Sequence, residues 1–306
     1  MSNTSTRINI EAGSLPDRFV LRRFKSGTMS GWRTMKEAGL TVAEVHQISD
    51  ARRAKSSINI FATPELEATK KHMKRCRNFF DHSNMSWGDN WRLIAKSRLD
   101  QQWEWEDSVK TENMNLYRLA IESVRDRKER DRIELSEGGK ASLYNPGLYP
   151  SEEVMLDSYV FRFEPGVVPD PSRDVRSGSS HEQTERFRNE LADSYNRQAR
   201  DAHNTMLKRI MEEASHVEER CDGYTGKRAG SFNDTLIPRL INIAQLVKTN
   251  NIYEDDDLDN LCSQVMDDYA NITTKDLRES EDLRKEASGK ARDIKAALNK
   301  LKSSKY

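Results

Sequence analysis

The chain has 306 residues, of which 33% are charged and 35% hydrophobic, and its formal net charge is zero. With only 14 Gly and 8 Pro, this composition is typical of long, solvated helices and argues against a compact α/β enzyme. No segment approaches the ~20 consecutive apolar residues of a membrane-spanning helix. Three cysteines without a Cys-x-x-Cys pair favour a reducing, cytoplasmic environment and argue against a disulfide framework.

The neutral net charge conceals an uneven distribution. From Arg7 to Arg77 there are 15 Lys and Arg against 7 Asp and Glu, whereas from Asn250 to Lys285 there are 4 against 11. Such asymmetry suits either an anionic partner at the basic end or pairing of the two ends within one fold. The sequence leaves both interpretations open.

The N-terminal part of the sequence predicts a leader without regular structure, followed by a strand and two helices. Residues 1–16 are polar, lack a signal-peptide pattern and are expected to form a flexible leader. Apolar and basic residues alternate over 18–24, which predicts a strand. The pattern Thr41-x-x-Glu44 is a capping box that predicts a helix start. Thr63 as N-cap and Pro64 at the first helical position predict a second, basic helix through about Phe80.

The sequence "DQQWEWEDSV" contains two tryptophans one residue apart. We expect a helix that is capped by Asp89 and runs from Trp91 to about Arg132. At 100° per residue, Trp103 and Trp105 fall near opposite edges of an apolar arc roughly 200° wide. This pattern favours two tryptophans at the edges of a bundle core over a stacking platform for bases or a clamp for a sugar.

The remaining elements follow a clear break at Gly138-Gly139 and Pro146-Gly147. A short helix is predicted from Ser151 to Leu156, and alternating aromatics from Tyr159 to Phe163 predict a strand that three prolines end.

The strongest helical periodicity of the chain runs from His181 to Cys221. Two further amphipathic helices follow, the first opened by Ser231-x-x-Asp234 and containing Pro238 near its start, where proline costs little. A final helix with a basic tail ends the chain.

The predicted fold is therefore mainly α, an elongated helical bundle with long antiparallel helices and a short β excursion near 159–168. The expected parts are a leader (1–16), basic helices with the Trp-rich helix (17–135), a loop with the short helix and strand (136–180), and C-terminal helices packing on the N-terminal ones (181–306).

The motifs of common catalytic and cofactor sites are missing from the sequence. There is no Gly-x-Ser-x-Gly elbow and no P-loop. His72 and Cys76 have a spacing found in metal sites, but a structural zinc needs about four ligands. A buried Cys76 beside a surface His72 explains this pair more simply. We predict no catalytic residue, no cofactor and no metal, and therefore not an enzyme.

A basic stretch with nearby aromatics is the one candidate contact surface. Its cations suit phosphate contacts, and Phe79, Phe80 and Trp87 suit base stacking. The same cations also suit a protein partner, and a solvated helix face is the simplest alternative. The candidate contact residues are Arg52, Arg53, Lys55, Lys70, Lys71, Lys74, Arg75 and Arg77.

Several segments, taken in order, resemble a family of unknown function found in phages and bacteria. The resemblance extends over about residues 30–300, and its motifs are architectural, so it supplies no active-site residues. The matching segments are "SGWR", "FATPELEATKKHMKRCRNFF", "WRLIAKSRLDQQWEWEDSVKTENMNLYRLAIE", "YPSEEVMLDSYVFRFEPGVVPDP" and "AGSFNDTLIPRLINIAQLVKTNNIYEDDDLDNL".

Members of that family are commonly encoded beside MoxR-type AAA+ ATPases and von Willebrand A-domain proteins. The resemblance implies a non-enzymatic, phage-encoded adaptor that works with such a partner in the host cytoplasm. Two other functions remain open: nucleic-acid binding through the basic helices, and a virion or assembly protein whose helices form homo-oligomeric contacts.

Overall fold

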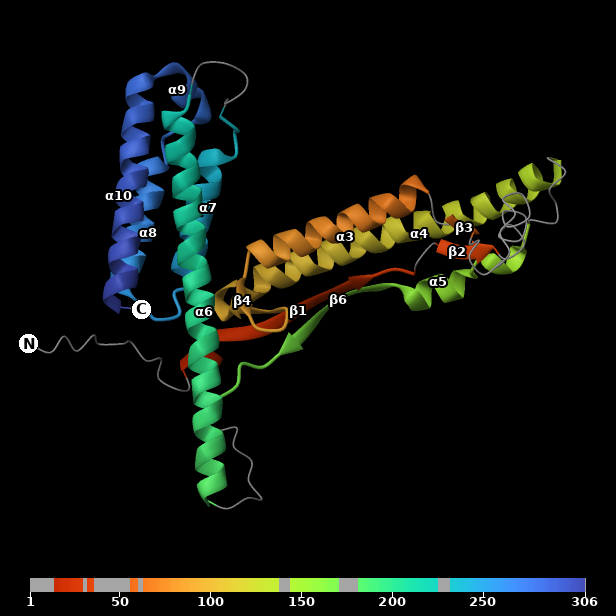
Figure 1. Cartoon of the computed structure of the whole chain (residues 1–306), viewed down its shortest axis with the longest axis horizontal. Coiled ribbons are helices and arrows are strands. Elements are labelled where there is room, and N and C mark those ends of the chain that lie inside the picture. The colour runs from red at the N-terminus through yellow and green to blue at the C-terminus, as the bar shows by residue number, and fades with distance from the viewer. Residues whose placement is uncertain are drawn as a thin grey trace, which may run out of the picture. The chain divides into compact units, whose positions relative to one another are not determined.

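The computed structural model describes residues 14–29, 32–35, 56–59, 63–137, 144–170, 181–224 and 232–305. The chain forms two compact units. Unit 1 comprises Met1–Arg23, Asp81–Leu99 and Pro165–Tyr306, and unit 2 comprises Phe24–Phe80 and Asp100–Glu164. Both units are therefore built from segments that are distant in sequence. The fold is mainly α with a small β part, which confirms the predicted class (Figure 1).

Most of the helices belong to unit 1, together with one hairpin. Its elements are α1 (Ser14–Arg18), the first half of β1 (Phe19–Gly27), β4 (Met85–Trp87), β5 (Trp91–Ala95), η2 (Lys96–Arg98), α6 (His181–Asp222), α7 (Leu236–Thr249), α8 (Asp256–Tyr269), α9 (Thr274–Glu279) and α10 (Glu281–Lys305). Unit 2 is built around two long helices. Its elements are the rest of β1, β2 (Trp32–Met35), β3 (Ser56–Asn59), α3 (Pro64–His82), α4 (Leu99–Glu137), η4 (Pro146–Leu148), α5 (Glu152–Ser158) and β6 (Val160–Gly166).

The strands form a four-stranded sheet in the order β4-β5-β1-β6 and a separate β2-β3 pair. β1 pairs antiparallel with β5, with Phe19 opposite Ala95, and β4 pairs antiparallel with β5. The strands predicted over 18–24 and from Tyr159 are confirmed as β1 and β6. The β excursion is thus larger than its single predicted segment near 159–168.

The predicted helix start at Trp91 is wrong. Gly88, Asp89 and Asn90 all have positive φ, and the amide of Trp91 donates to the carbonyl of Gly88 at 2.8 Å. This left-handed turn closes the β4-β5 hairpin and cannot serve as a helix cap, which needs extended backbone. Residues Trp91–Ala95 therefore continue as a strand, and α4 begins only at Leu99.

Helix α3 begins where the sequence predicted. The Thr63 hydroxyl accepts from the amide of Leu66 at 3.3 Å, and Pro64 is the first helical residue. Ser151 caps α5 in the same way, through the amide of Val154 at 3.3 Å. The helix predicted from the Thr41-x-x-Glu44 capping box lies outside the described residues.

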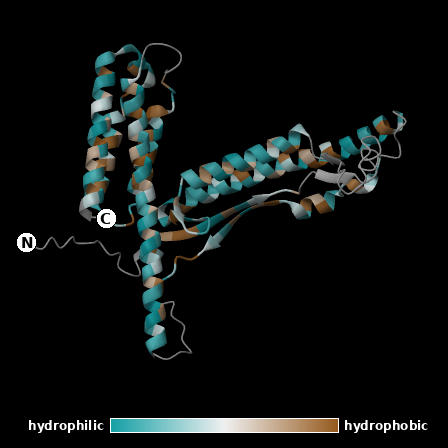
Figure 2. Cartoon of the chain, viewed as in Figure 1, coloured by the Kyte–Doolittle hydropathy of each residue, from teal (hydrophilic) through white to brown (hydrophobic). Residues whose placement is uncertain are grey.

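The helices of unit 1 form an antiparallel bundle. Ser288 on α10 bonds Asp222 near the end of α6, whereas Lys295 further along α10 pairs with Glu218, one turn earlier on α6. The helix predicted from His181 to Cys221 is confirmed, and Figure 2 shows hydrophobic residues interspersed with hydrophilic ones along these helices. Fully buried alanines lie where α6 and α10 face the core, a pattern that allows helices to approach closely. They are Ala199, Ala202, Ala214, Ala287 and Ala291.

The predicted final helix is divided in two. Thr273 and Asp276 form a capping box that starts α9, and Ser280 has extended backbone angles that end it. The Ser280 hydroxyl then accepts from the amide of Leu283 at 3.1 Å at the start of α10. Pro238 lies in the first turn of α7 as predicted, whereas Ser231 of the expected cap lies outside the described residues.

Candidate functional site

The candidate basic residues do not form one uniform surface. Arg52, Arg53 and Lys55 lie outside the described residues. The other five belong to α3. Lys70 pairs with Glu67 at 3.0 Å, and half-buried Arg77 donates to the Ser26 hydroxyl at 3.1 Å.

The remaining three cations define what we call the α3 basic face: Lys71, Lys74 and Arg75. All three are exposed, and within the described residues none of them forms an ion pair. Phe79 follows one turn after Arg75 and is 52% exposed. Phe80 and Trp87, in contrast, are buried and unavailable for base stacking. The α3 basic face is therefore smaller than the predicted set, with one exposed aromatic.

The two tryptophans have different environments. Trp105 is partly buried and packs against Phe79, Phe80 and Phe163, with ring centroids 4.8, 6.4 and 5.5 Å away. Its predicted place at the edge of a core is confirmed. Trp103 is 47% exposed, so about half of this side chain faces solvent and it lies at the outer limit of the predicted core edge. Because they point in different directions from α4, the pair does not make a joint stacking platform.

A buried polar cluster connects α3, α4 and Tyr159, the residue between α5 and β6. The Asn113 side-chain amide donates to His72 Nδ1 at 2.8 Å and accepts from the Tyr159 hydroxyl at 2.9 Å. Cys76 Sγ lies 3.6 Å from His72 Nε2, and exposed Glu112 lies 3.2 Å from the same nitrogen. His72 is only 4% exposed, so its predicted surface position is wrong. Asn113 holds the ring inside because it satisfies the nitrogen that burial removes from water.

Cysteine, histidine and asparagine are also the residue types of a cysteine nucleophile with its base and orienting amide. Here, however, burial, followed by the nearby Glu112 charge, raises the pKa of the Cys76 thiol to about 11. A nucleophilic cysteine needs a lowered pKa, because the thiolate attacks. The cluster therefore acts as packing and hydrogen-bonding structure. Within the described residues, no three His, Cys, Asp or Glu side chains come together as a metal site.

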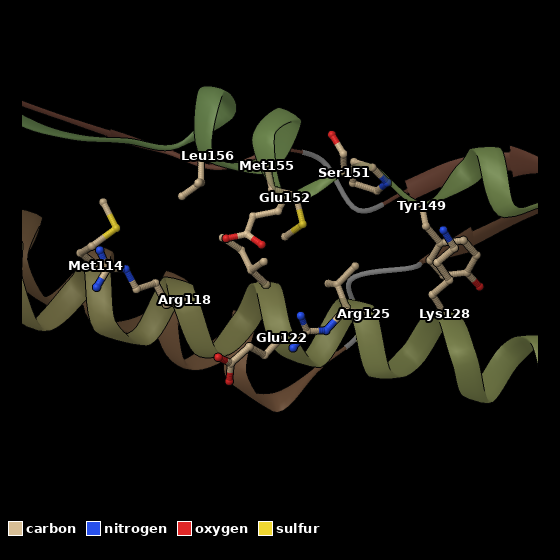
Figure 3. A pocket seen from close by; sticks show the side chains of 13 residues that line it. Met114, Arg118, Glu122, Arg125, Lys128, Tyr149, Ser151, Glu152, Met155 and Leu156 are labelled. Atoms are coloured by element: carbon tan, nitrogen blue, oxygen red, sulfur yellow. The ribbon is translucent and has the colours of Figure 1, made fainter.

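A groove of about 520 Å³ lies between α4 and the segment that leads into α5 (Figure 3). Its bottom consists of buried apolar side chains, and Leu156, 40% exposed, forms part of its edge. The lining residues are Met114, Arg118, Ile121, Glu122, Val124, Arg125, Lys128, Tyr149, Pro150, Ser151, Glu152, Met155 and Leu156. We call this site the α4–α5 groove. Its volume lies within the range of roughly 300–1,000 Å³ that is usual for ligand pockets.

Three cations line the groove on α4: Arg118, Arg125 and Lys128. Two carboxylates, Glu122 and Glu152, also line it, so the lining carries three positive and two negative charges. None of the three cations is ion-paired within the part of the chain that the structure describes. The α4–α5 groove thus combines an apolar bottom with cations that are available to a ligand.

The nearest buried acid does not neutralise these cations. Asp131 is 5% exposed and already accepts from Arg127 Nε at 2.7 Å and from the Tyr149 hydroxyl. Its charge is therefore matched by Arg127. Burial, followed by the hydrogen bond to Asp131, raises the pKa of Tyr149, which keeps this phenol protonated at the end of the groove.

The sequence contained a signal for the groove that pattern reading missed. The charges of alternating sign at residues 125–134 are typical of an exposed helix end. Arg118, Arg125 and Lys128, however, fall on one side of α4, next to the stripe that contains Ile121 and Val124. Only the return of the chain through Tyr149 to Leu156 places a second wall opposite them (Figure 3).

Comparisons with known proteins give no relative for this chain. No protein-family model matches the sequence, and the searches of curated proteins and of solved structures found no match. Among the described helices, none is long and apolar enough to cross a membrane.

Proposed function

We propose that the protein is a non-enzymatic helical adaptor that binds another protein through unit 2. The observation that carries the proposal is the α4–α5 groove. Its buried apolar bottom, its exposed Leu156 and its three cations, which have no ion-pair partner among the described residues, offer both a hydrophobic and an electrostatic contact. An adaptor needs such a surface and no reactive group, and the raised pKa of Cys76 agrees with that.

The partner that we propose is a AAA+ ATPase of the MoxR type or a von Willebrand A-domain protein in the cytoplasm of a phage-infected cell. Support for this choice comes from the sequence resemblance alone, over residues 30–300. The fold is compatible with it, because long helices in two units provide large surfaces for an ATP-driven remodelling machine.

The test is to purify the tagged chain after co-expression with one AAA+ and one von Willebrand A-domain protein from the same genome. We expect one of them to co-purify at a defined ratio and to stay bound after nuclease treatment, and we expect any ATPase activity of the sample to require the AAA+ protein. If neither binds, the proposed partner class is wrong. ATP hydrolysis by the isolated chain would contradict the non-enzymatic role.

The α3 basic face favours nucleic-acid binding as a second candidate function. Lys71, Lys74 and Arg75 are exposed and unpaired among the described residues, with exposed Phe79 one turn away. Phosphate contacts release counterions, so binding of single-stranded DNA should fall steeply between 50 and 200 mM salt. Reversing Lys71, Lys74 and Arg75 to Glu should abolish it, and reversal of Arg130, exposed on α4, serves as the matched control. Binding that does not depend on salt would exclude this function.

A further inference from the structure

We infer that the α4–α5 groove binds a short acidic peptide segment with bulky apolar side chains at its centre, presented by a partner protein. The inference rests on the proposed adaptor function and specifies the chemistry that this site recognises. It follows from three observations: the spacing of the cations along α4, the apolar side chains beneath them, and the mixture of cations with two carboxylates in the lining.

The spacing of the cations indicates the length of the ligand. Arg118, Arg125 and Lys128 lie at helical positions i, i+7 and i+10, which spans about 15 Å along α4 at 1.5 Å per residue. An extended peptide advances about 3.3 Å per residue, so about five residues cover this row. A single small anion would reach only one end of it. Carboxylates three or four residues apart would reach both Arg118 and Arg125.

The bottom of the groove indicates apolar side chains between those carboxylates. Ile121 and Val124 of α4 and Met155 of α5 are 8%, 2% and 2% exposed, so the groove ends on packed hydrophobic atoms. Leu156, at 40%, is a large apolar side chain left at the edge. A bound apolar side chain would remove the exposed surface of Leu156 from water while it rests on the packed atoms beneath. Figure 3 shows Met155 and Leu156 facing the α4 side chains across the groove.

The mixed character of the lining favours a peptide over a nucleic acid. A phosphate backbone would meet Glu122 and Glu152 as well as the cations, and its binding would gain little from Met155 and Leu156. The α3 basic face, which has no acid among its three members, is the better phosphate surface. A peptide can direct its acids to Arg118 and Arg125 and leave small or apolar residues opposite Glu122 and Glu152.

The test uses the full chain and an array of fluorophore-labelled hexapeptides. Each peptide has Asp or Glu at the two outer positions on each side and Leu, Ile, Phe or Met at the two central positions. We expect a subset to bind, and binding to fall at least about tenfold when both central residues are serine or when the acids become lysine. If no peptide binds, the inference is wrong.

Two variants and a matched control locate the binding. The double variant R118E/R125E should weaken the best peptide at least about tenfold, because two attractive contacts become repulsive. Leu156→Ser should weaken it through the apolar contact alone, while Arg130→Glu should leave binding unchanged. Unaltered circular dichroism melting of each variant shows that the fold is intact. Peptide binding that R118E/R125E does not change would place the site elsewhere and overturn the inference.

The same double variant separates this inference from the proposed function. If R118E/R125E releases the co-purified ATPase or von Willebrand A-domain protein, the groove is the partner site. If the partner still co-purifies with R118E/R125E while this variant no longer binds the peptides, the adaptor function stands and the inference about the groove is wrong. Tighter binding of a single-stranded oligonucleotide than of any peptide at this groove, lost in R118E/R125E, would also overturn it.

Discussion

The two units are stabilised by different kinds of interior. In unit 1 the core is mainly aliphatic and rich in small residues, as in the fully buried Ala202, Ile210 and Leu258, although aromatic side chains such as Tyr269 are also buried there. In unit 2 the core is aromatic, with Phe24, Phe161 and Phe163 in contact at centroid distances of 4.7–6.1 Å.

Unit 2 also buries several polar side chains that bond to one another. Gln102 donates to Glu106 at 3.1 Å, and Asn113 joins His72 to Tyr159. Unit 1 also buries bonded polar side chains, such as Asn251, which donates to Asp259 at 2.8 Å, but most of its core consists of closely packed aliphatic side chains. Unit 2 has fewer helices, and its register depends on large rings and on hydrogen bonds that only one alignment satisfies. The unit with the less continuous core is also the one that contains the candidate groove.

The largest expected effect tests the packing of unit 1. Leu258→Ala removes a fully buried side chain on α8 and should lower the free energy of unfolding by about 2–5 kcal/mol. Hydrogen exchange should show loss of protection in α6, α7 and α8 first. The control is Leu119→Ala, because Leu119 is 52% exposed. A similar loss for both variants would contradict the close-packed description of unit 1.

The second effect tests the polar interior of unit 2. Asn113→Ala leaves His72 Nδ1 and the Tyr159 hydroxyl without their partner, which should cost about 1–3 kcal/mol in urea unfolding. Exposed Asn115, two residues away on the same helix, provides the matched control. If Asn113→Ala behaves like Asn115→Ala, the network does not specify unit 2.

A smaller effect concerns the ion pairs between α6 and α10. Arg292 contacts Glu218 at 2.9 Å and Asp222 at 2.5 Å, whereas Arg186 pairs with Glu190 on its own helix. Arg292→Ala should lower the melting temperature slightly, and less than Asn113→Ala does, because these groups face solvent. High salt should remove the difference from wild type. A decrease that persists in high salt would show that packing, and not charge, is lost.

The smallest expected effect on the free energy of unfolding at neutral pH comes from the buried thiols of both units. Burial raises the pKa of Cys76 and Cys221 to about 11 and that of Cys262 to about 12, from 9.0. Above pH 9 the unfolded chain loses thiol protons that the folded chain keeps, so the thiols make stability fall as pH rises from 9 toward 12. Below pH 9 they contribute no slope.

Urea unfolding at pH 8, 9 and 10 measures this dependence. Cys262→Ala should reduce the slope above pH 9, since the most strongly shifted thiol is then missing. In unit 2, Cys76→Ala should reduce it less. Constant or rising stability above pH 9 would mean that the thiols are accessible to water.

Local signals in the sequence were sufficient for many elements. Three elements depend only on neighbouring residues, and their local patterns predict them correctly. They are the start of α3 at Thr63-Pro64, the strand from Tyr159, and α6 with its four-residue periodicity. Local patterns failed at Trp91, because aromatic and aliphatic residues suit a strand as well as a helix over so short a run. The left-handed turn at Asp89 and Asn90 and the pairing of β5 with β1 decided for the strand.

The sequence by itself determined the helical class, the position of α6 and the absence of familiar catalytic motifs, because these follow from composition and period. The tertiary structure alone decided which distant segments form each unit, that His72 is buried, and that Arg118, Arg125 and Lys128 line a groove. The physical reason is that a groove needs two walls. Its second wall, from Tyr149 to Leu156, reaches α4 only after the chain reverses, and no local pattern on α4 encodes that return.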